Sequence, residues 1–376
     1  MRIAFYAPLK PPVHAVPSGD RRIGRLLIDA LTLAGHEVTL ASRLRSWDGA
    51  GDADRQHRLA MLGERLASRY LRRTAPPPEL WFTYHLYDKA PDHLGPRIAD
   101  ALGIPYVVAE ASVAPKRLGG AWAAGFASTA AALARADAVI GLNEADAAGV
   151  LPLLPDPARY HRLRPFLDLR PFAAARQKRA ATRADLAARF GLDPARVWIV
   201  ALAMMRPGVK LDSYRLLAAA LTPLAGHSWQ LLAVGDGAAR EEVATALGPL
   251  GRQAVLAGAV AAHAVPDLLA AADLLAWPAI GEAYGMAVLE AQAAGLPVVA
   301  GRGPGIEGIV AEGGTALLTP PGDAAALTAA LGSLLDDPAR RTAMGAAAQR
   351  LVARRHDLPQ AADRLDTILR LAACAH

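Results

Sequence analysis

The sequence predicts an α/β protein made of two doubly wound parallel sheets. Short apolar runs alternate with alanine-rich amphipathic segments, and this alternation starts again near the middle of the chain. Strands separated by helices pair in parallel, because each helix returns the chain to the end of the sheet from which it started. The chain has 376 residues, more than one hydrophobic core usually organises, so we expect two domains.

The N-terminal half contains the first series of strands. The expected strands are residues 2–6, 37–41, 80–84, 105–109 and 137–142. A helix is predicted over 21–35, where Gly35 follows the last helical position as a C-cap. The first run holds about five apolar residues before a proline cluster, too few for the apolar region of a signal peptide, so we interpret it as a strand.

The second series of strands begins after the segment "RPFLDLRPF", which has no clear period. The expected strands are residues 197–203, 229–235, 253–258, 273–278, 296–301 and 315–320. We predict an N-terminal domain over 1–168 and a C-terminal domain over 169–357, with a linker at roughly 165–176. The last helix, 358–376, is expected to pack back on the N-terminal domain.

Composition excludes several classes of protein. Cys374 is the single cysteine, which rules out a disulfide framework and a cysteine-ligated zinc site and fits a reducing cytosol. The sequence is 53% hydrophobic, yet no apolar run reaches the roughly 18 residues of a membrane span. Aromatic residues make up 5% of the chain and acids are scattered among the bases, so nucleic acid is not an expected partner. We expect a cytoplasmic protein.

The charge distribution indicates an anionic partner for the N-terminal half. The chain carries a formal net charge of +6, and residues 1–170 hold 22 Lys and Arg against 17 Asp and Glu. The segment 53–78 places arginines among Leu62 and Leu66 at helical spacing. Such a basic amphipathic helix can lie on an anionic bilayer, here through 53–75 at the inner face of the cytoplasmic membrane. The alternative is a surface helix whose leucines pack on the core of the N-terminal domain.

Two loops of the C-terminal half carry residues suited to a nucleoside diphosphate. Arg206 and Lys210 stand four positions apart after the first strand of this half, and two cations there suit a diphosphate, the alternative being a solvated loop. Gly235 and Gly237 form a tight turn that lets a nucleotide approach the backbone, before a helix expected from about Ala238. The spacing falls short of G-x-G-x-x-G, so a nicotinamide site is not favoured.

Two carboxylates frame the next loop, in "GEAYGMAVLEAQAAGLPVVAG". Glu282 and Glu290 stand eight positions apart, around a helix expected to start near Tyr284 or Gly285. The free N–H groups of a helix N-terminus bind anions, and here they are expected at Gly285, Met286 and Ala287. On this arrangement Glu290 accepts hydrogen bonds from ribose hydroxyls and Glu282 reaches hydroxyls of a transferred sugar. The alternative makes Glu282 a helix-capping acid and Glu290 a surface residue.

These stretches together resemble the retaining, nucleotide-sugar-dependent glycosyltransferases of the GT-B fold, family four. "GEAYGMAVLEAQAAGLPVVA" is similar to the E-x7-E region of that family, "RPGVKL" to its donor-phosphate loop and "VGDG" to its nucleotide-proximal turn. "PSGDRRIGRLLIDALTLAGHEVTLAS" looks like its glycine-rich loop and first helix, and Val260 lies in a stretch similar to its base-binding loop. The resemblance implies the GT-B fold, in which two Rossmann-like domains face a central cleft.

The chain departs from the family pattern in its N-terminal half. Ser18-Gly19 stands where the family often has Gly-Gly, so the serine hydroxyl is expected to contact the donor or to narrow its site. Glu110 follows the strand 105–109, where many members place a histidine, and is the acceptor-side candidate. His85, after the third strand, is the candidate residue near the sugar.

The resemblance implies a retaining hexosyltransferase that uses a nucleoside diphosphate sugar and a glycan or lipid-linked acceptor, in cell-envelope or exopolysaccharide synthesis. It implies no cofactor and no metal, and no D-x-D dyad occurs in a donor-loop context. The catalytic candidates are Arg206, Lys210, Glu282 and His85. The donor-binding candidates are Ser18, Gly19, Gly235, Gly237, Val260, Ala283, Tyr284, Gly285, Met286, Ala287 and Glu290. The alternatives are a nucleotide-sugar epimerase of the same fold and a non-catalytic nucleotide-sugar-binding relative.

Overall fold

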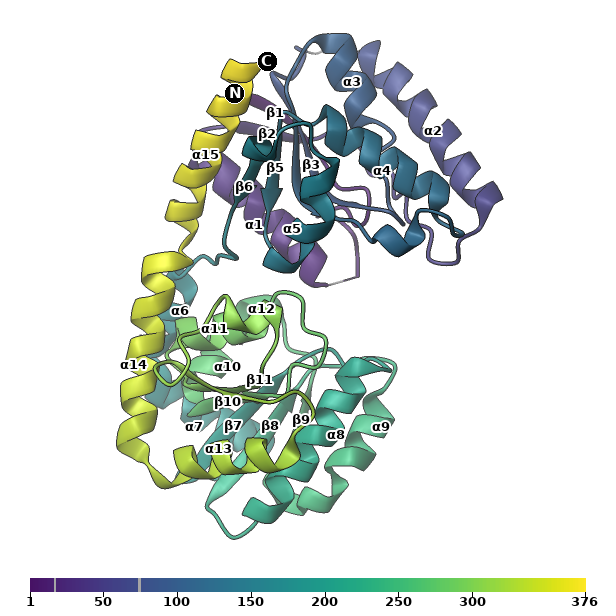
Figure 1. The fold of residues 1–376 in the computed structure, drawn as a ribbon. Helices are drawn as coiled ribbons and strands as arrows, with labels where there is room; N and C mark the ends of the chain where they lie inside the picture. The colour runs from purple at the N-terminus through teal and green to yellow at the C-terminus, as the bar shows by residue number, and fades with distance from the viewer. Residues whose placement is uncertain (17, 74–75) are drawn as a thin grey trace. The chain divides into compact units, whose positions relative to one another are not determined.

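The chain forms two compact α/β units, each built around one parallel sheet (Figure 1). The computed structural model describes residues 1–16, 18–73 and 76–376. The first unit comprises Met1–Arg164 together with Leu358–His376, and the second comprises Pro165–Asp357.

The boundary between the units lies at 164/165, whereas the sequence places it at 168/169. The intervening residues join the second unit because Leu167 forms a β-bridge with Asp357 and its backbone N–H donates to the carbonyl of His356. The predicted linker is therefore structured, and helix α6 (Arg170–Gln177) begins inside it.

The sheet of the first unit has the strand order β2-β1-β3-β4-β5-β6, and all of its neighbouring strands pair in parallel. Its strands are β1 (Arg2–Tyr6), β2 (Glu37–Leu40), β3 (Leu80–Tyr87), β4 (Tyr106–Ser112), β5 (Ala138–Gly141) and β6 (Tyr160–Arg162). Its helices are α1 (Gly19–Leu33), α2 (Ala53–Leu71), α3 (Gly95–Leu102), α4 (Ala123–Arg135), α5 (Glu144–Val150) and α15 (Leu358–Ala375). β2 is an edge strand, because β1 is its single neighbour in this sheet. The chain then crosses from β2 over β1 to β3.

The sheet of the second unit has the order β12-β11-β10-β7-β8-β9, again parallel. Its strands are β7 (Val197–Leu202), β8 (Trp229–Val234), β9 (Ala254–Gly258), β10 (Leu274–Trp277), β11 (Val298–Gly301) and β12 (Ala316–Thr319). Its helices are α6, α7 (Arg179–Phe190), α8 (Val209–Leu221), α9 (Arg240–Leu247), α10 (Val265–Ala271), α11 (Met286–Ala294), α12 (Pro304–Glu307), α13 (Ala324–Asp336) and α14 (Pro338–Arg355). In the described part of the chain, no helix is long and apolar enough to cross a membrane.

The strand–helix alternation read from the sequence corresponds to eleven of these strands, and the predicted α/β class with two parallel sheets is confirmed. β6 was not predicted, because it has three residues and is at most half-buried, so it carries no apolar run. Helix α9 begins at Arg240 rather than near Ala238, because the turn continues through Ala239.

Helix α1 shows how local sequence builds a layer of the first unit. Ser18 is its N-cap, and the serine hydroxyl oxygen accepts a hydrogen bond from the N–H of Arg21 at 3.2 Å. Ile23, Leu27 and Leu31 recur at helical spacing and are buried. α1 packs against α15, which follows it by more than three hundred residues in the chain but belongs to the same unit (Figure 1).

Each sheet has one position where the order of connection reverses. In the first unit this position lies between β1 and β3, and in the second it lies between β7 and β10. The loops that leave two such strands diverge to opposite faces, which opens a crevice at the carboxyl ends of the strands. These two crevices are where binding residues are expected.

The packing of α15 on the first unit is testable with two leucines of this helix. Leu369 is fully buried, whereas Leu371 is 55% exposed. We expect Leu369→Ala to lower the stability of the first unit by about 2–5 kcal/mol, and Leu371→Ala to change it by less than about 0.5 kcal/mol. Hydrogen–deuterium exchange should report faster exchange in α1 for the first variant, with exchange in β7 and β8 unchanged. Equal effects of both substitutions would contradict the docking of this face.

Candidate functional site

The crevice of the second unit brings a cation and an acid together. Lys210 lies in the first turn of α8, and Glu282 lies in the loop after β10. The ammonium Nζ of Lys210 is 2.5 Å from Oε2 of Glu282, and the indole N–H of Trp277 donates to the same oxygen at 3.3 Å. The Lys210 ammonium also lies 5.4 Å from the Trp277 ring centroid. The start of α8 and the loop that follows β10 are thus joined by one ion pair.

Glycine fixes the loop that carries Arg206. The N–H of Met205 donates to the carbonyl of Asp236 at 3.0 Å, so this loop is bonded to the turn after β8. Gly235 in that turn has φ +147°, and a Cβ there would lie 1.9 Å from the carbonyl oxygen of Ala203. No other residue fits this position. The glycine therefore lets the two loops pack directly against each other.

Arg206 does not join the ion pair. Its side chain is exposed, and its guanidinium lies 3.2 Å from the sulfur of Met204. The structure therefore brings Lys210, and not Arg206, to Glu282. Arg206 stays a candidate for a diphosphate, on the loop that precedes α8.

Helix α11 begins at Met286, one to two residues later than predicted. Gly285 is its N-cap in the left-handed region at φ +61°, and no side chain caps the helix. The first-turn N–H groups of Met286 and Ala287 are therefore left for another acceptor. A Cβ on Gly285 would lie 2.8 Å from the carbonyl oxygen of Gly305, so this turn is held closely against the start of α12.

The two acids around this helix differ in environment. Glu290 is only 3% exposed, between the buried Leu289 and Ala291, so the alternative that made it a surface residue is wrong. Glu282 contributes no side-chain cap to α11, so the alternative that made it a capping acid is also wrong. A carboxylate is costly to bury, and its retention inside this helix favours a specific role.

The remaining predicted donor-binding residues lie on the same loops. Tyr284, Met286 and Ala287 are half-buried, and Ala283 is exposed. Val260, which follows β9, is half-buried. All of them lie beyond the carboxyl ends of strands, where the crevice of an open sheet is found.

The crevice of the first unit holds a histidine between two carboxylates. His85 Nδ1 lies 3.3 Å from an oxygen of Asp20 and 3.4 Å from an oxygen of Glu110. Asp20 is in the first turn of α1, directly after Gly19 and the N-cap Ser18. Sequence reasoning missed Asp20, because an acid in the first turn of a helix is common for electrostatic reasons alone.

His85 and Glu110 lie inside their strands, not after them as predicted. Their φ angles are +61° and +58°, in the left-handed region that non-glycine residues rarely adopt. They also stand at the same level of neighbouring strands, since Tyr84 pairs with Ala109 just before them and the ladder resumes just after them. Such a conformation costs on the order of 1–3 kcal/mol per residue and clusters at functional sites.

The two carboxylates favour a protonated histidine. Burial lowers the pKa of His85, but the negative charges of Glu110 and Asp20 outweigh it, so the pKa is raised. Burial raises the pKa of Asp20, but the hydrogen bond and charge of His85 outweigh it, so the pKa is lowered. His85 is thus arranged to donate hydrogen bonds.

The side chains that bind metal ions in proteins include those of His, Cys, Asp and Glu. Among the residues that the structure describes, no group of three or more of these side chains is placed to hold a metal ion.

Solved structures similar to almost the whole chain share its fold. HepE of Anabaena, solved with UDP, has a TM-score of 0.73 at 18% identity and covers 98% of this chain and all of its own. Sucrose-phosphate synthase from Thermosynechococcus elongatus has a TM-score of 0.75 at 20% identity, with 100% of both chains covered. At these identities the likeness shows the fold, which is the GT-B fold of glycosyltransferases.

The sequence comparisons then identify the second unit more closely. Residues 196–337, which run from the start of β7 to the end of α13 and include all strands of this sheet, match the family model described as Glycosyl transferases group 1. The predicted resemblance to glycosyltransferases is thereby confirmed for this part of the chain.

Curated relatives match over part of their length. The α-D-kanosaminyltransferase of Streptomyces kanamyceticus is 30% identical over 194 residues, which cover 50% of this chain and 49% of that protein. The D-inositol 3-phosphate glycosyltransferase of Salinispora tropica is 32% identical over 232 residues, covering 58% and 48%. The chain spans about half the length of the curated relatives it matches.

The electrostatics of the first crevice predict a pH-dependent stability. A raised pKa means that the stabilisation by His85 is complete below its ordinary pKa of about 6.5 and is lost as the pH rises through the raised value. The difference in unfolding free energy between wild type and His85→Gln should therefore shrink as the pH rises above about 6.5. Chemical denaturation across this range measures it. His57→Gln, at an exposed position of α2, should give a flat difference, and a flat difference for His85→Gln would contradict the assignment.

Proposed function

We propose that the chain is a retaining glycosyltransferase that moves a hexose from a nucleoside diphosphate sugar to a glycan or lipid-linked acceptor. One observation carries the proposal: Lys210 and Glu282 meet at the reversal point of the sheet whose sequence matches a glycosyltransferase family. The relatives named as glycosyltransferases and the fold shared with a UDP-bound protein support it. We propose that this transfer belongs to cell-envelope or exopolysaccharide synthesis.

The donor diphosphate is assigned to the loops of the second unit. Lys210, Arg206 and the first-turn N–H groups of α11 supply positive charge or partial charge to its oxygens. Glu290 is assigned to the ribose hydroxyls and Val260 to the base. Glu282, already next to Lys210, is assigned to hydroxyls of the sugar adjoining the diphosphate.

The transfer is a substitution at the anomeric carbon with its configuration retained. The bond from this carbon to the diphosphate oxygen breaks, the acceptor hydroxyl oxygen bonds to the same face, and the departing diphosphate takes the hydroxyl proton. Negative charge grows on the diphosphate as the bond breaks, so fixed cations and N–H dipoles aimed at it lower the barrier. This is electrostatic stabilisation by the chain alone, without a metal or a cofactor.

In the first unit, His85 and Glu110 are assigned to the sugar and the acceptor. Two carboxylates raise the pKa of His85 against the effect of burial, which favours the protonated form that donates hydrogen bonds. We therefore assign His85 a positioning contact with a sugar oxygen. Ser18 uses its hydroxyl oxygen to cap α1, which leaves its O–H and the N–H of Gly19 for a ligand.

Helix α2 supports association with an anionic membrane surface. Leu66 packs on the core of the first unit, as the surface-helix alternative expects, but Met61 and Leu62 are 39% and 43% exposed. Apolar side chains exposed beside arginines are typical of a helix that lies on a bilayer. Of the predicted segment 53–75, residues 74–75 lie outside those the structure describes. We propose a peripheral protein at the inner face of the cytoplasmic membrane.

Two substitutions test the donor site. Arg206→Ala should lower turnover by about two to three orders of magnitude, because it removes charge aimed at the leaving diphosphate. Glu290→Ala should weaken binding of the nucleotide sugar by about tenfold, because it removes an acceptor for ribose hydroxyls. Steady-state kinetics and calorimetry with UDP-glucose, the donor seen in a HepE complex, provide a first measurement.

The control is Arg215→Ala on the exposed surface of α8, which should leave both quantities unchanged. Unchanged activity and binding in both Arg206→Ala and Glu290→Ala would overturn the site. Release of an epimerised nucleotide sugar would instead favour an epimerase, and binding without turnover on any donor would favour a non-catalytic relative.

A further inference from the structure

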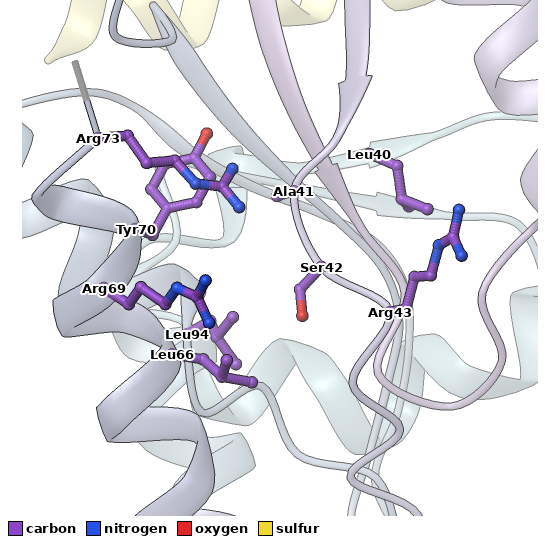
Figure 2. Close-up of a pocket in the computed structure, with 9 residues that line it drawn as sticks. All are labelled: Leu40, Ala41, Ser42, Arg43, Leu66, Arg69, Tyr70, Arg73 and Leu94. Carbon is purple, nitrogen blue, oxygen red and sulfur yellow. The ribbon is translucent and has the colours of Figure 1, made fainter. Parts of the chain in front are cut away.

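A cavity of about 350 Å³ lies beside the edge strand β2 of the first unit. One wall is the segment that leaves β2, and the other is the C-terminal part of α2 (Figure 2). Leu66 and Leu94 give it an apolar lining, and Leu94 is fully buried. Because β2 is at the sheet edge, this cavity is separate from the crevice between β1 and β3.

Three arginines line this cavity. Arg69 of α2 and Arg73, two residues beyond the end of that helix, lie on one side, Arg43 lies on the other, and the Ser42 hydroxyl lies between them (Figure 2). The guanidinium of Arg73 is stacked over the ring of Tyr70, with its carbon 4.7 Å from the centroid. None of the described residues that line the cavity is acidic. Within the same described ranges, neither Arg43 nor Arg69 forms an ion pair.

Like charges gathered at one cavity repel one another unless an anion is bound among them. Arg69 lies in the last turn of α2 and Arg73 lies just beyond its end, so both guanidinium groups stand on the same side of the cavity. Guanidinium groups pair with phosphate through two parallel N–H···O bonds, and the Ser42 O–H is a further donor.

We propose that this cavity binds a phosphate monoester, which is either a small soluble alcohol phosphate or the headgroup of a lipid. A terminal phosphate carries close to two negative charges and presents three oxygens, which suits a cavity lined by arginines on two sides. The volume is near the lower end of that of ligand pockets, so it admits a phosphate with a small polar group and excludes an acyl chain.

Calorimetry with inorganic phosphate and glycerol 3-phosphate, at constant ionic strength, tests the proposal. Arg69→Gln and Arg43→Gln should each weaken saturable binding by about tenfold, since each removes a charge-assisted hydrogen bond. Arg69→Lys keeps the charge and loses the planar fork, so it should weaken binding by less. Arg65→Gln is the matched control, because it removes the same charge from an exposed position one turn earlier on α2 and does not line the cavity.

Arg206→Ala separates this cavity from the proposed donor site. Binding of phosphate should persist in that variant, whatever happens to its transfer activity. Binding that is lost in Arg206→Ala and kept in Arg69→Gln would assign the phosphate to the donor loop and overturn the proposal.

Vesicles distinguish the two sources of the phosphate. Phosphatidylcholine vesicles that contain phosphatidic acid present a monoester, and vesicles of matched charge that contain phosphatidylglycerol present a diester. Binding to the first that depends on Arg69 and Arg43, without binding of glycerol 3-phosphate, identifies a lipid headgroup. Binding of glycerol 3-phosphate, without binding to either kind of vesicle, identifies a soluble ligand. Absence of saturable binding to every probe, or equal weakening by Arg65→Gln and Arg69→Gln, would overturn the proposal.

Discussion

The ion pair between Lys210 and Glu282 determines how the second unit presents its binding residues. It joins the start of α8, the helix that follows β7, to the loop after β10. β7 and β10 are the two strands between which the sheet reverses. Both side chains are about one-fifth exposed, so the pair is less screened than a surface pair but still reached by solvent. In this state the carboxylate already neutralises the ammonium. A diphosphate gains the full attraction of Lys210 only by drawing it away from Glu282, which frees that carboxylate for sugar hydroxyls.

The first unit also carries a basic side chain paired with carboxylates at the position where its sheet reverses, but there the basic residue is a histidine. There the reversal lies between β1 and β3, and the group at its centre is His85, which lies next to carboxylates of α1 and β4. The left-handed backbone of His85 and Glu110 turns both side chains out of the strand pattern. The surrounding sheet must stabilise that conformation, and this is easier where each strand is paired on both sides, as β3 and β4 are.

Much of this arrangement follows from local sequence. The apolar runs mark the strands, and the spacing of Glu282 and Glu290 marks the loop and helix between them. What local sequence does not specify is which loops are neighbours. The contact of Asp20 with His85 depends on β1 lying beside β3, and that of Lys210 with Glu282 on β7 lying beside β10. The positive φ angles of His85 and Glu110 could not be predicted from the sequence either, because neither residue type indicates a left-handed backbone. The arginine-lined cavity could not be predicted from the helical pattern over 53–78, because its other wall is the end of β2 and the segment that follows it.

In this account Lys210 binds the diphosphate, and Glu282 competes with the diphosphate for Lys210 when no sugar is bound. A double-mutant cycle on the affinity for UDP, measured by calorimetry, tests this most directly. We predict that Lys210→Met weakens UDP binding by about tenfold and that Glu282→Gln strengthens it, because the ammonium is released. In the Lys210→Met background, Glu282→Gln should have no effect. Unchanged affinity in Lys210→Met, or the same loss on Glu282→Gln in both backgrounds, would contradict the account.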